Sequence, residues 1–319
     1  MAAVVTQPPA PAARGFFAFL KDGVVAAARN RGLFLPLAAL HAGRSMAFFL
    51  ANRLLFRYFA TAVDLDAHDS LDGKLLLALL SKFLAGRWRF LMPAGVAYLA
   101  AHEALVLAID VATATAAVAS CSSVDGAEPH RRHATTTLAS LLRKVRRNLL
   151  GPMDTAAYGE KVGWAIAGVA MMVAPRAAYL GPAVAVLGRL VQLAAFLFTF
   201  FYFAVVRAVA VVVSVAEPGR CTAGAVGRAR RLMRGGRRLA QAALCAPAAW
   251  ALMNTAVWKV YGVTAARLPG SIVTAPLGID GVVVYLLLGA LKVVCSAIVT
   301  AYYFDCRSSE EEEKAGHKE

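Results

Sequence analysis

The stretch VQLAAFLFTFFYFAVV, Val191–Val206, contains no charged side chain, and VVVYLLLGAL, Val282–Leu291, is equally free of charge. Arginine and lysine crowd instead into the segments between such stretches, and mostly into alternate ones. This distribution is typical of a helical membrane protein with several spans and one orientation, because cytoplasmic connections carry an excess of basic residues. It predicts an all-α fold, that of a polytopic helical membrane protein.

The composition of the chain points the same way. Of the 319 residues, 59% are apolar and 17% are charged, and the mean hydropathy is +0.60. Soluble domains average about 45–50% apolar and about 25% charged residues. Within a bilayer, all backbone N–H and C=O groups must pair inside the protein, which leaves helices or closed barrels. The apolar runs lack the alternation of barrel strands, so we expect helices.

Six segments satisfy the need of a helical span for about 20 mostly apolar residues. The first contains His41 and Arg44, and the third is interrupted by Pro175 and Arg176. The six predicted spans are Gly32–Ala51, Met92–Ser120, Val162–Tyr179, Leu187–Val215, Ala240–Tyr261 and Ile279–Phe304.

The basic residues give these spans an orientation. The two ends of the chain and the connections after the second and fourth spans hold 21 of the 34 basic residues, while the opposite connections hold nine. The positive-inside rule therefore predicts that both termini are cytoplasmic. One alternative stays open at Leu71–Leu91. We interpret this segment as an amphipathic helix on the membrane surface, but as a seventh span it would move the C-terminus outside.

Three basic segments precede the odd-numbered spans and are predicted to form amphipathic helices at the membrane surface. They are Phe16–Arg29, Leu138–Leu150 and Thr222–Leu239. Their charges explain the net charge of +15 as attraction to anionic lipid headgroups, which is worth about 1 kcal/mol for each basic residue near the surface.

The chain is predicted to form one six-span membrane domain, residues 15–306, between two disordered tails. The first tail is residues 1–14, which are rich in alanine and proline, and the second is residues 307–319, which are acidic. The run Glu310–Glu313 in the second tail is expected to keep it away from anionic lipid and to bind nothing.

Ionisable residues inside predicted spans are the best pointers to function, because burying them is costly. In the second span, Glu103 and Asp110 lie seven residues apart on one face, and His102 lies beside that face. They predict a polar pathway or a binding pocket at mid-membrane. The alternative is that these charges only hold helices together. The candidate partners in other spans are Arg44, Arg189, Arg207 and Lys292.

The segment GRARRLMRGGRR, Gly227–Arg238, places six arginines in twelve residues. Arginine makes bidentate contacts with phosphate, so the segment is predicted to contact anionic lipid. No aromatic residues for base stacking are interleaved with the arginines, so no nucleic acid is expected as a partner. The predicted lipid contacts are Arg228, Arg230, Arg231, Arg234, Arg237 and Arg238.

The sixth span ends in an aromatic group followed by a cysteine. Cys306 comes after Tyr302, Tyr303 and Phe304. A juxtamembrane cysteine is a candidate for palmitoylation, with an unmodified thiol as the alternative, and the two tyrosines are interpreted as part of an interfacial aromatic belt. The five cysteines form no CxxC pair, so neither a disulfide framework nor a zinc site is expected.

Catalytic templates are missing from the sequence. It contains no GxSxG, Walker A or GxGxxG motif, and His102-Glu103 does not begin an HExxH motif because Val106 occupies the position of the second histidine. The sequence therefore predicts a non-enzymatic integral membrane protein without cofactor or metal, acting as a scaffold, a membrane-shaping factor or a trafficking factor. The alternative is a transporter or channel for a small or amphipathic solute. The oligomeric state, the protein partners and the identity of the membrane stay open.

Three patches carry a resemblance to a known family. They are VSVAEPG at Val213–Gly219, the segment Ala290–Arg307 with its Tyr-Tyr-Phe-Asp-Cys-Arg ending, and the basic segment Leu138–Leu150. Together they resemble a plant family of uncharacterised six-span membrane proteins, loosely related to the bacterial YciC-like and glycerophosphodiester-phosphodiesterase membrane-domain group. The resemblance implies a membrane location and six spans, and it brings no activity. The chain departs from that family in its richness in alanine and arginine and in Arg207.

Overall fold

The computed structural model describes residues 15–62, 88–122, 139–140, 143, 145, 148–172, 182–217, 219–267 and 279–316. Within these residues the regular structure is helical throughout, which confirms the all-α prediction. The helices are α1 (Ala18–Arg29), α2 (Arg31–Ala62), α4 (Trp88–Ser122), α6 (Leu150–Met172), α7 (Pro182–Ala216), α8 (Thr222–Leu232), α9 (Gly236–Arg267) and α10 (Ile279–Gly316).

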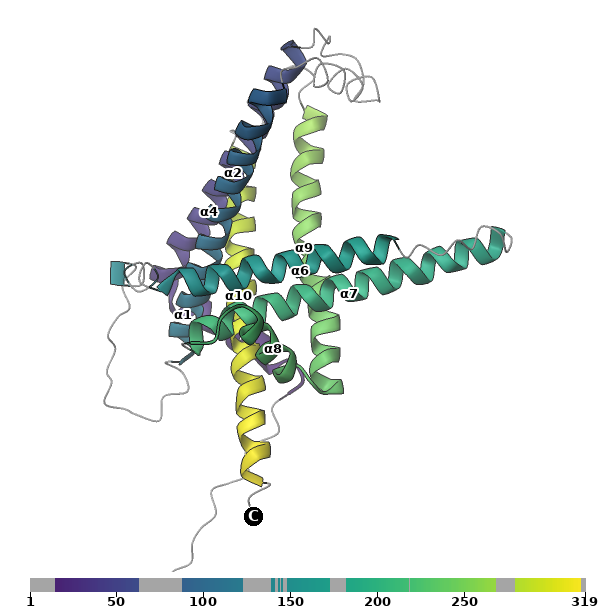
Figure 1. Ribbon diagram of the computed structural model, residues 1–319. Coiled ribbons are helices and arrows are strands. Elements are labelled where there is room, and N and C mark those ends of the chain that lie inside the picture. The colour runs from purple at the N-terminus through teal and green to yellow at the C-terminus, as the bar shows by residue number, and fades with distance from the viewer. Residues whose placement is uncertain are drawn as a thin grey trace, which may run out of the picture.

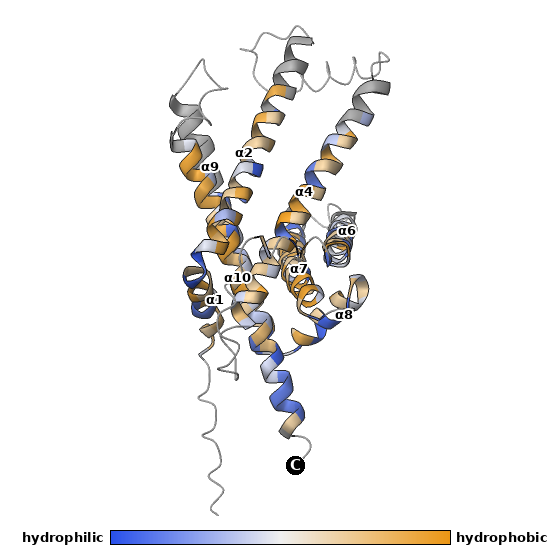
Figure 2. Cartoon of the chain, turned by 90° about the vertical axis from the view of Figure 1, so that its left-hand side faces the viewer, coloured by the Kyte–Doolittle hydropathy of each residue, from blue (hydrophilic) through white to orange (hydrophobic). Residues whose placement is uncertain are grey.

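The long helices run in two directions. In Figure 1, α2, α4, α9 and α10 run roughly along the long axis of the molecule, whereas α6 and α7 lie side by side across it. Figure 2, turned by 90°, shows α6 nearly end-on. The short helices α1 and α8 flank α10, and the C-terminal part of α10 projects beyond them (Figure 1).

Four helices of the described chain are long and apolar enough to cross a membrane. The candidate spans are Arg31–Asn52 in α2, Gly95–Ser122 in α4, Val186–Ala216 in α7 and Gly281–Ala315 in α10, each of which contains a long apolar window. They correspond to the first, second, fourth and sixth predicted spans. The third and fifth predicted spans overlap α6 and α9, which are helices but are not among these four.

Small residues let α10 pack closely against two neighbouring helices. A Cβ atom on Gly289 would collide with the backbone carbonyl group of Ala38 in α2, and a Cβ atom on Gly23 in α1 would lie 2.6 Å from the Cα of Ile298. In a bilayer, helices associate through this kind of packing, because lipid removes the hydrophobic driving force between them. Around these crossings Leu37, Ala116 and Ala297 are fully buried.

The predicted surface helix Thr222–Leu239 is broken in the structure. The first helix, α8, ends at Leu232, and α9 begins at Gly236. Between them Gly235 has a φ of +131°, a backbone conformation that side chains other than glycine's strongly disfavour. Arg238 then donates a hydrogen bond of 2.7 Å to the Leu232 carbonyl oxygen and so satisfies one group at the end of α8. The other surface helix within the described residues, at Phe16–Arg29, forms as α1.

The C-terminal segment is helical through Gly316, so the prediction that the tail is disordered from residue 307 was wrong. Charge pairs one turn apart stabilise this part of α10. Arg307 pairs with Glu311 at 2.9 Å, and Glu310 pairs with Lys314 at 2.7 Å. Glu310 also binds Arg228 of α8. This contact corrects the expectation that the acidic run binds nothing.

Other predictions fall wholly or partly outside the described residues. These are the tail of residues 1–14, most of the segment Leu71–Leu91 with its alternative of a seventh span, and much of Leu138–Leu150. From the last of these segments, Val145 is described and is buried in a cluster that also contains Leu37 and Ala297.

Candidate functional site: a polar cavity between the helices

A cavity of about 400 Å³ lies between α2, α4, α6, α7, α9 and α10. Ligand pockets in proteins typically measure about 300–1,000 Å³, so its size is that of a small-molecule site. Alanine and valine side chains form much of its wall. We call it the polar cavity because seven of its lining residues carry polar groups: His41, Asp110, Thr113, Arg207, Lys292, Cys295 and Ser296.

His41 is fixed at one side of the polar cavity. Its side chain is buried, and its Nε2 lies 3.1 Å from the hydroxyl oxygen of Thr113. The Thr113 hydroxyl donates its proton to the Ile109 carbonyl oxygen at 2.7 Å. Because a hydroxyl group has only one proton to donate, His41 must donate from Nε2 to Thr113. Its buried Nδ1 is then an acceptor with no hydrogen-bond partner within the described chain.

The three charged residues of the polar cavity come from three helices. Asp110 in α4 lies 4.0 Å from His41 Nε2. Arg207 in α7 pairs with Glu160 in α6 at 3.5 Å. Lys292 in α10 forms no ion pair within 4 Å among the described residues, and Asp110 attracts it from beyond that distance. Because Glu160 pairs with Arg207, Asp110 is the one carboxylate in the lining that faces Lys292.

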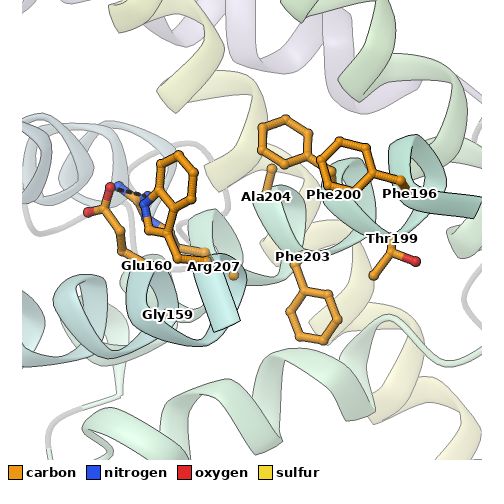
Figure 3. A pocket seen from close by; sticks show the side chains of 10 residues that line it. Gly159, Glu160, Phe196, Thr199, Phe200, Phe203, Ala204 and Arg207 are labelled. Carbon is orange, nitrogen blue, oxygen red and sulfur yellow. Dashed lines mark ion pairs between the residues drawn. The ribbon is translucent and has the colours of Figure 1, made fainter. Parts of the chain in front are cut away.

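A second, smaller cavity lies next to the polar cavity at α7. It measures about 200 Å³, and most of its lining is apolar. We call it the aromatic slot. Figure 3 shows the Glu160–Arg207 pair at one end of it and Phe196 and Phe200 at the other. Ala204 and Arg207 line both cavities, so the two spaces adjoin at these residues.

The structure brings together part of the polar site predicted from sequence. Asp110, Arg207 and Lys292 line one cavity, whereas His102 and Glu103 lie apart from it. His102 stacks on Phe48 with ring centroids 3.8 Å apart, and Glu103 is exposed.

Glu103 lies outside the polar cavity because other helices cover only the second half of α4. Residues 95–105 of α4 are mostly exposed and residues 107–117 are mostly buried, so Glu103 and Asp110 differ in environment although they share a face. Of the other candidate partners, Arg44 donates to the neighbouring Ser45 hydroxyl, and Arg189 is exposed. Sequence reasoning missed His41 as a site residue because it treated that histidine only as a flaw in the first span.

The arginines of Gly227–Arg238 separate into two groups. Arg228 is only 15% exposed, lies 2.7 Å from Glu310 and lies 3.5 Å from Glu217. The hydrogen bond to Glu310 raises the pKa of Arg228. These contacts engage the side chain, which corrects its prediction as a lipid contact. Arg237 lies over the Phe16 ring at 5.8 Å, and Arg238 caps α8. The exposed members are Arg230, Arg231, Arg234 and Arg237, and of these Arg237 makes the contact with Phe16.

The end of the sixth predicted span is interior, not interfacial. Cys306 is 1% exposed, which is not the environment of a palmitoylation site. Tyr302 and Tyr303 are buried as well, and their hydroxyl groups donate hydrogen bonds of 3.0 Å to the Arg238 carbonyl oxygen and to Glu217. They hold α10 against the end of α7 and the start of α9 and do not form an aromatic belt.

Comparison with known proteins gives a family without an activity. No group of three or more histidine, cysteine, aspartate or glutamate residues in the described part of the chain is arranged to hold a metal ion. No curated protein and no solved structure matches the chain. The family model that matches is Domain of unknown function (DUF8558), over residues 80–316. This range contains α4 to α10, and with them Asp110, Arg207 and Lys292 of the polar cavity. The chain belongs to the DUF8558 family.

Proposed function

We propose that this protein is a non-enzymatic integral membrane protein that binds a small or amphipathic solute in the polar cavity and transports it. One observation supports the proposal above all. Asp110, Arg207 and Lys292, which lie far apart in the sequence, line one cavity of ligand size between apolar helices. Intramembrane charges of this kind mark solute pathways. If Lys292 only held helices together, we would expect it to form an ion pair with a carboxylate. Among the described residues it forms none within 4 Å.

We further propose six spans with both termini in the cytoplasm. In Figure 1, α1, α8 and the C-terminal end of α10 lie toward one end of the molecule, and the last turn of α2, the first turn of α4 and the last turn of α9 lie toward the other. The basic helices α1 and α8 lie at the same end as the C-terminal end of α10 (Figure 1), and the positive-inside rule assigns such an end to the cytoplasm. In Figure 1 α6 and α7 lie across the other long helices, so the third and fourth spans of this layout rest on their apolar sequence alone. The resemblance to the plant six-span family supports the same layout.

Cys295 lines the polar cavity, so its reaction with a water-soluble reagent shows whether water enters the cavity. If the cavity is a solute pathway, Cys295 should react in native membranes with a water-soluble, sulfonate-bearing methanethiosulfonate reagent. The buried Cys121 and Cys306 should stay unlabelled. Peptide mass spectrometry reads the labelled positions without changing the sequence. Protection of Cys295 until the protein is denatured would contradict the proposed pathway.

Charge substitutions test whether the polar cavity controls access. Asp110→Asn removes the only carboxylate that lines the cavity among the described residues, so the anionic reagent should modify Cys295 about fivefold faster, for a charge–charge interaction of about 1 kcal/mol. Glu103→Gln is the matched control, because it makes the same chemical change on an exposed part of the same helix. Equal rates in the two variants would show that Asp110 does not act on the contents of the cavity.

A second candidate function, a scaffold or membrane-shaping factor that touches anionic lipid, is supported by the exposure of Arg230, Arg231 and Arg234. Replacing all three with glutamine should weaken tethering of anionic vesicles to proteoliposomes about a hundredfold, at about 1 kcal/mol for each arginine. Arg228→Gln is the control, because this side chain is already engaged by Glu310. The same loss with neutral vesicles would contradict lipid recognition by charge.

A further inference from the structure

We propose that the solute of the polar cavity is a single-chain amphiphile with an anionic head group, whose head binds at Arg207 and Lys292 and whose chain occupies the aromatic slot. This inference rests on the proposed function. It adds to that function the chemical class of the solute, the orientation in which it binds and the side from which it enters.

The shared lining of the two cavities suggests the shape of the ligand. Ala204 and Arg207 line both spaces, so a molecule that reached from one into the other would be polar at one end and apolar at the other. Figure 3 shows the same polarity within the aromatic slot, with the charges of Glu160 and Arg207 at one end and the Phe196 and Phe200 rings at the other. The slot measures only about 200 Å³, which leaves room for one apolar chain and not for two side by side.

The aromatic slot opens on an apolar surface of the protein. Trp164, which lines it, is 70% exposed, and Phe200 is 43% exposed. Large apolar residues that are exposed on an apolar helix such as α7 contact lipid in an integral membrane protein. An amphiphile dissolved in the bilayer would therefore reach the slot laterally between α6 and α7, without crossing the surrounding water.

The charges of the polar cavity favour an anionic head group. Lys292 forms no ion pair within 4 Å among the described residues, although Asp110 attracts it from farther away, and Arg207 is held by Glu160 at 3.5 Å with both side chains about 30% exposed. A carboxylate or a phosphate would satisfy Lys292 and would compete with Glu160 for Arg207, because charge-assisted hydrogen bonds from arginine to these groups are strong. A cationic head would meet both positive side chains and leave Lys292 unpaired.

Photo-crosslinking tests this assignment with the full-length protein in nanodiscs. The probe is a C16 carboxylic acid with a diazirine on its chain, and mass spectrometry maps the crosslinked residues. We expect crosslinks at Phe196–Ala204 of α7. An unlabelled C16 carboxylate should remove them, whereas a C16 trimethylammonium compound and a short-chain hexanoate should not. Equal displacement by the cationic amphiphile, or full displacement by hexanoate, would overturn the assignment.

Two substitutions at the shared wall should act in opposite directions. Arg207→Gln removes a cation that binds the head group, so labelling should require about tenfold more probe, which is the usual effect of losing one charged hydrogen bond. Glu160→Gln removes the competing carboxylate and frees Arg207, so labelling should saturate at a severalfold lower concentration. If both variants bind more weakly, the pair only supports the α6–α7 packing, and the head group does not bind there.

The two proposals fail in distinguishable ways. If Cys295 reacts with the sulfonate reagent but the C16 carboxylate does not crosslink α7, the pathway stands and the solute class is wrong. If Cys295 is protected and the crosslinks nevertheless form, a lipid-facing binding site stands and the transport function fails.

Discussion

Gly289→Leu is expected to leave almost no folded monomeric protein. At this position α10 crosses α2 so closely that even a Cβ atom would collide with the Ala38 carbonyl group and approach the Ala42 nitrogen at 3.1 Å. Both partners are backbone atoms, so no rotamer change can relieve the collision. Overpacking of a core typically costs about 1–3 kcal/mol, and a forced separation of two helices exceeds that range. Total stabilities are only about 5–15 kcal/mol.

The measurement is size-exclusion chromatography of the solubilised protein with fluorescence detection, before and after heating. Gly43→Leu is the matched control, because it makes the same substitution in α2 next to Ala42, but on a side of the helix where a Cβ would meet no atom within 4 Å. Leucine also favours a helix more than glycine does, so the control should be as stable as the native protein. A normal profile for Gly289→Leu would show that α2 and α10 do not pack as described.

Arg228→Ala is expected to release the C-terminal end of α10. The Arg228 guanidinium binds Glu310 of α10 and Glu217 at the end of α7. The two carboxylates are only 23% and 17% exposed, so without the shared cation they would be left poorly solvated. Breaking a buried ion pair costs about 3–5 kcal/mol. Because this cluster is partly exposed and Arg220 and Lys314 still pair with the carboxylates, we expect about 2 kcal/mol.

Limited proteolysis measures this release. A glutamyl endopeptidase should cleave at Glu310–Glu313 at least tenfold faster in Arg228→Ala than in the native protein, since 1.4 kcal/mol corresponds to a factor of ten. Arg230→Ala is the control, because Arg230 lies two residues away on α8 and is exposed. Arg228→Lys should restore only part of the protection, because lysine cannot bridge two carboxylates as a planar guanidinium does. Equal cleavage of all variants would show that the pair does not hold the end of α10.

The pattern of apolar and charged residues along the sequence predicted much of the fold. The long charge-free runs led to the expectation of helices at α2, α4, α7 and α10, and the structure contains them. The end of α10 could not be predicted in the same way. Ser308 and the following glutamates read as a solvated tail, but Glu310 finds Arg228 on another helix, 82 residues away in the sequence. The residues next to Glu310 in the sequence do not indicate a partner that lies so far away in the chain.

The candidate site shows the same limit more clearly. The sequence by itself determined that Asp110, Arg207 and Lys292 lie within apolar helices, because the apolar run around each one identifies its helix. Only the tertiary structure decided that these three residues share a cavity with His41 while Glu103 lies outside it. The physical reason is that other helices pack over only part of α4. A helix fixes which residues share a face, but the packing of other helices over one half of that face decides which charges leave water and meet.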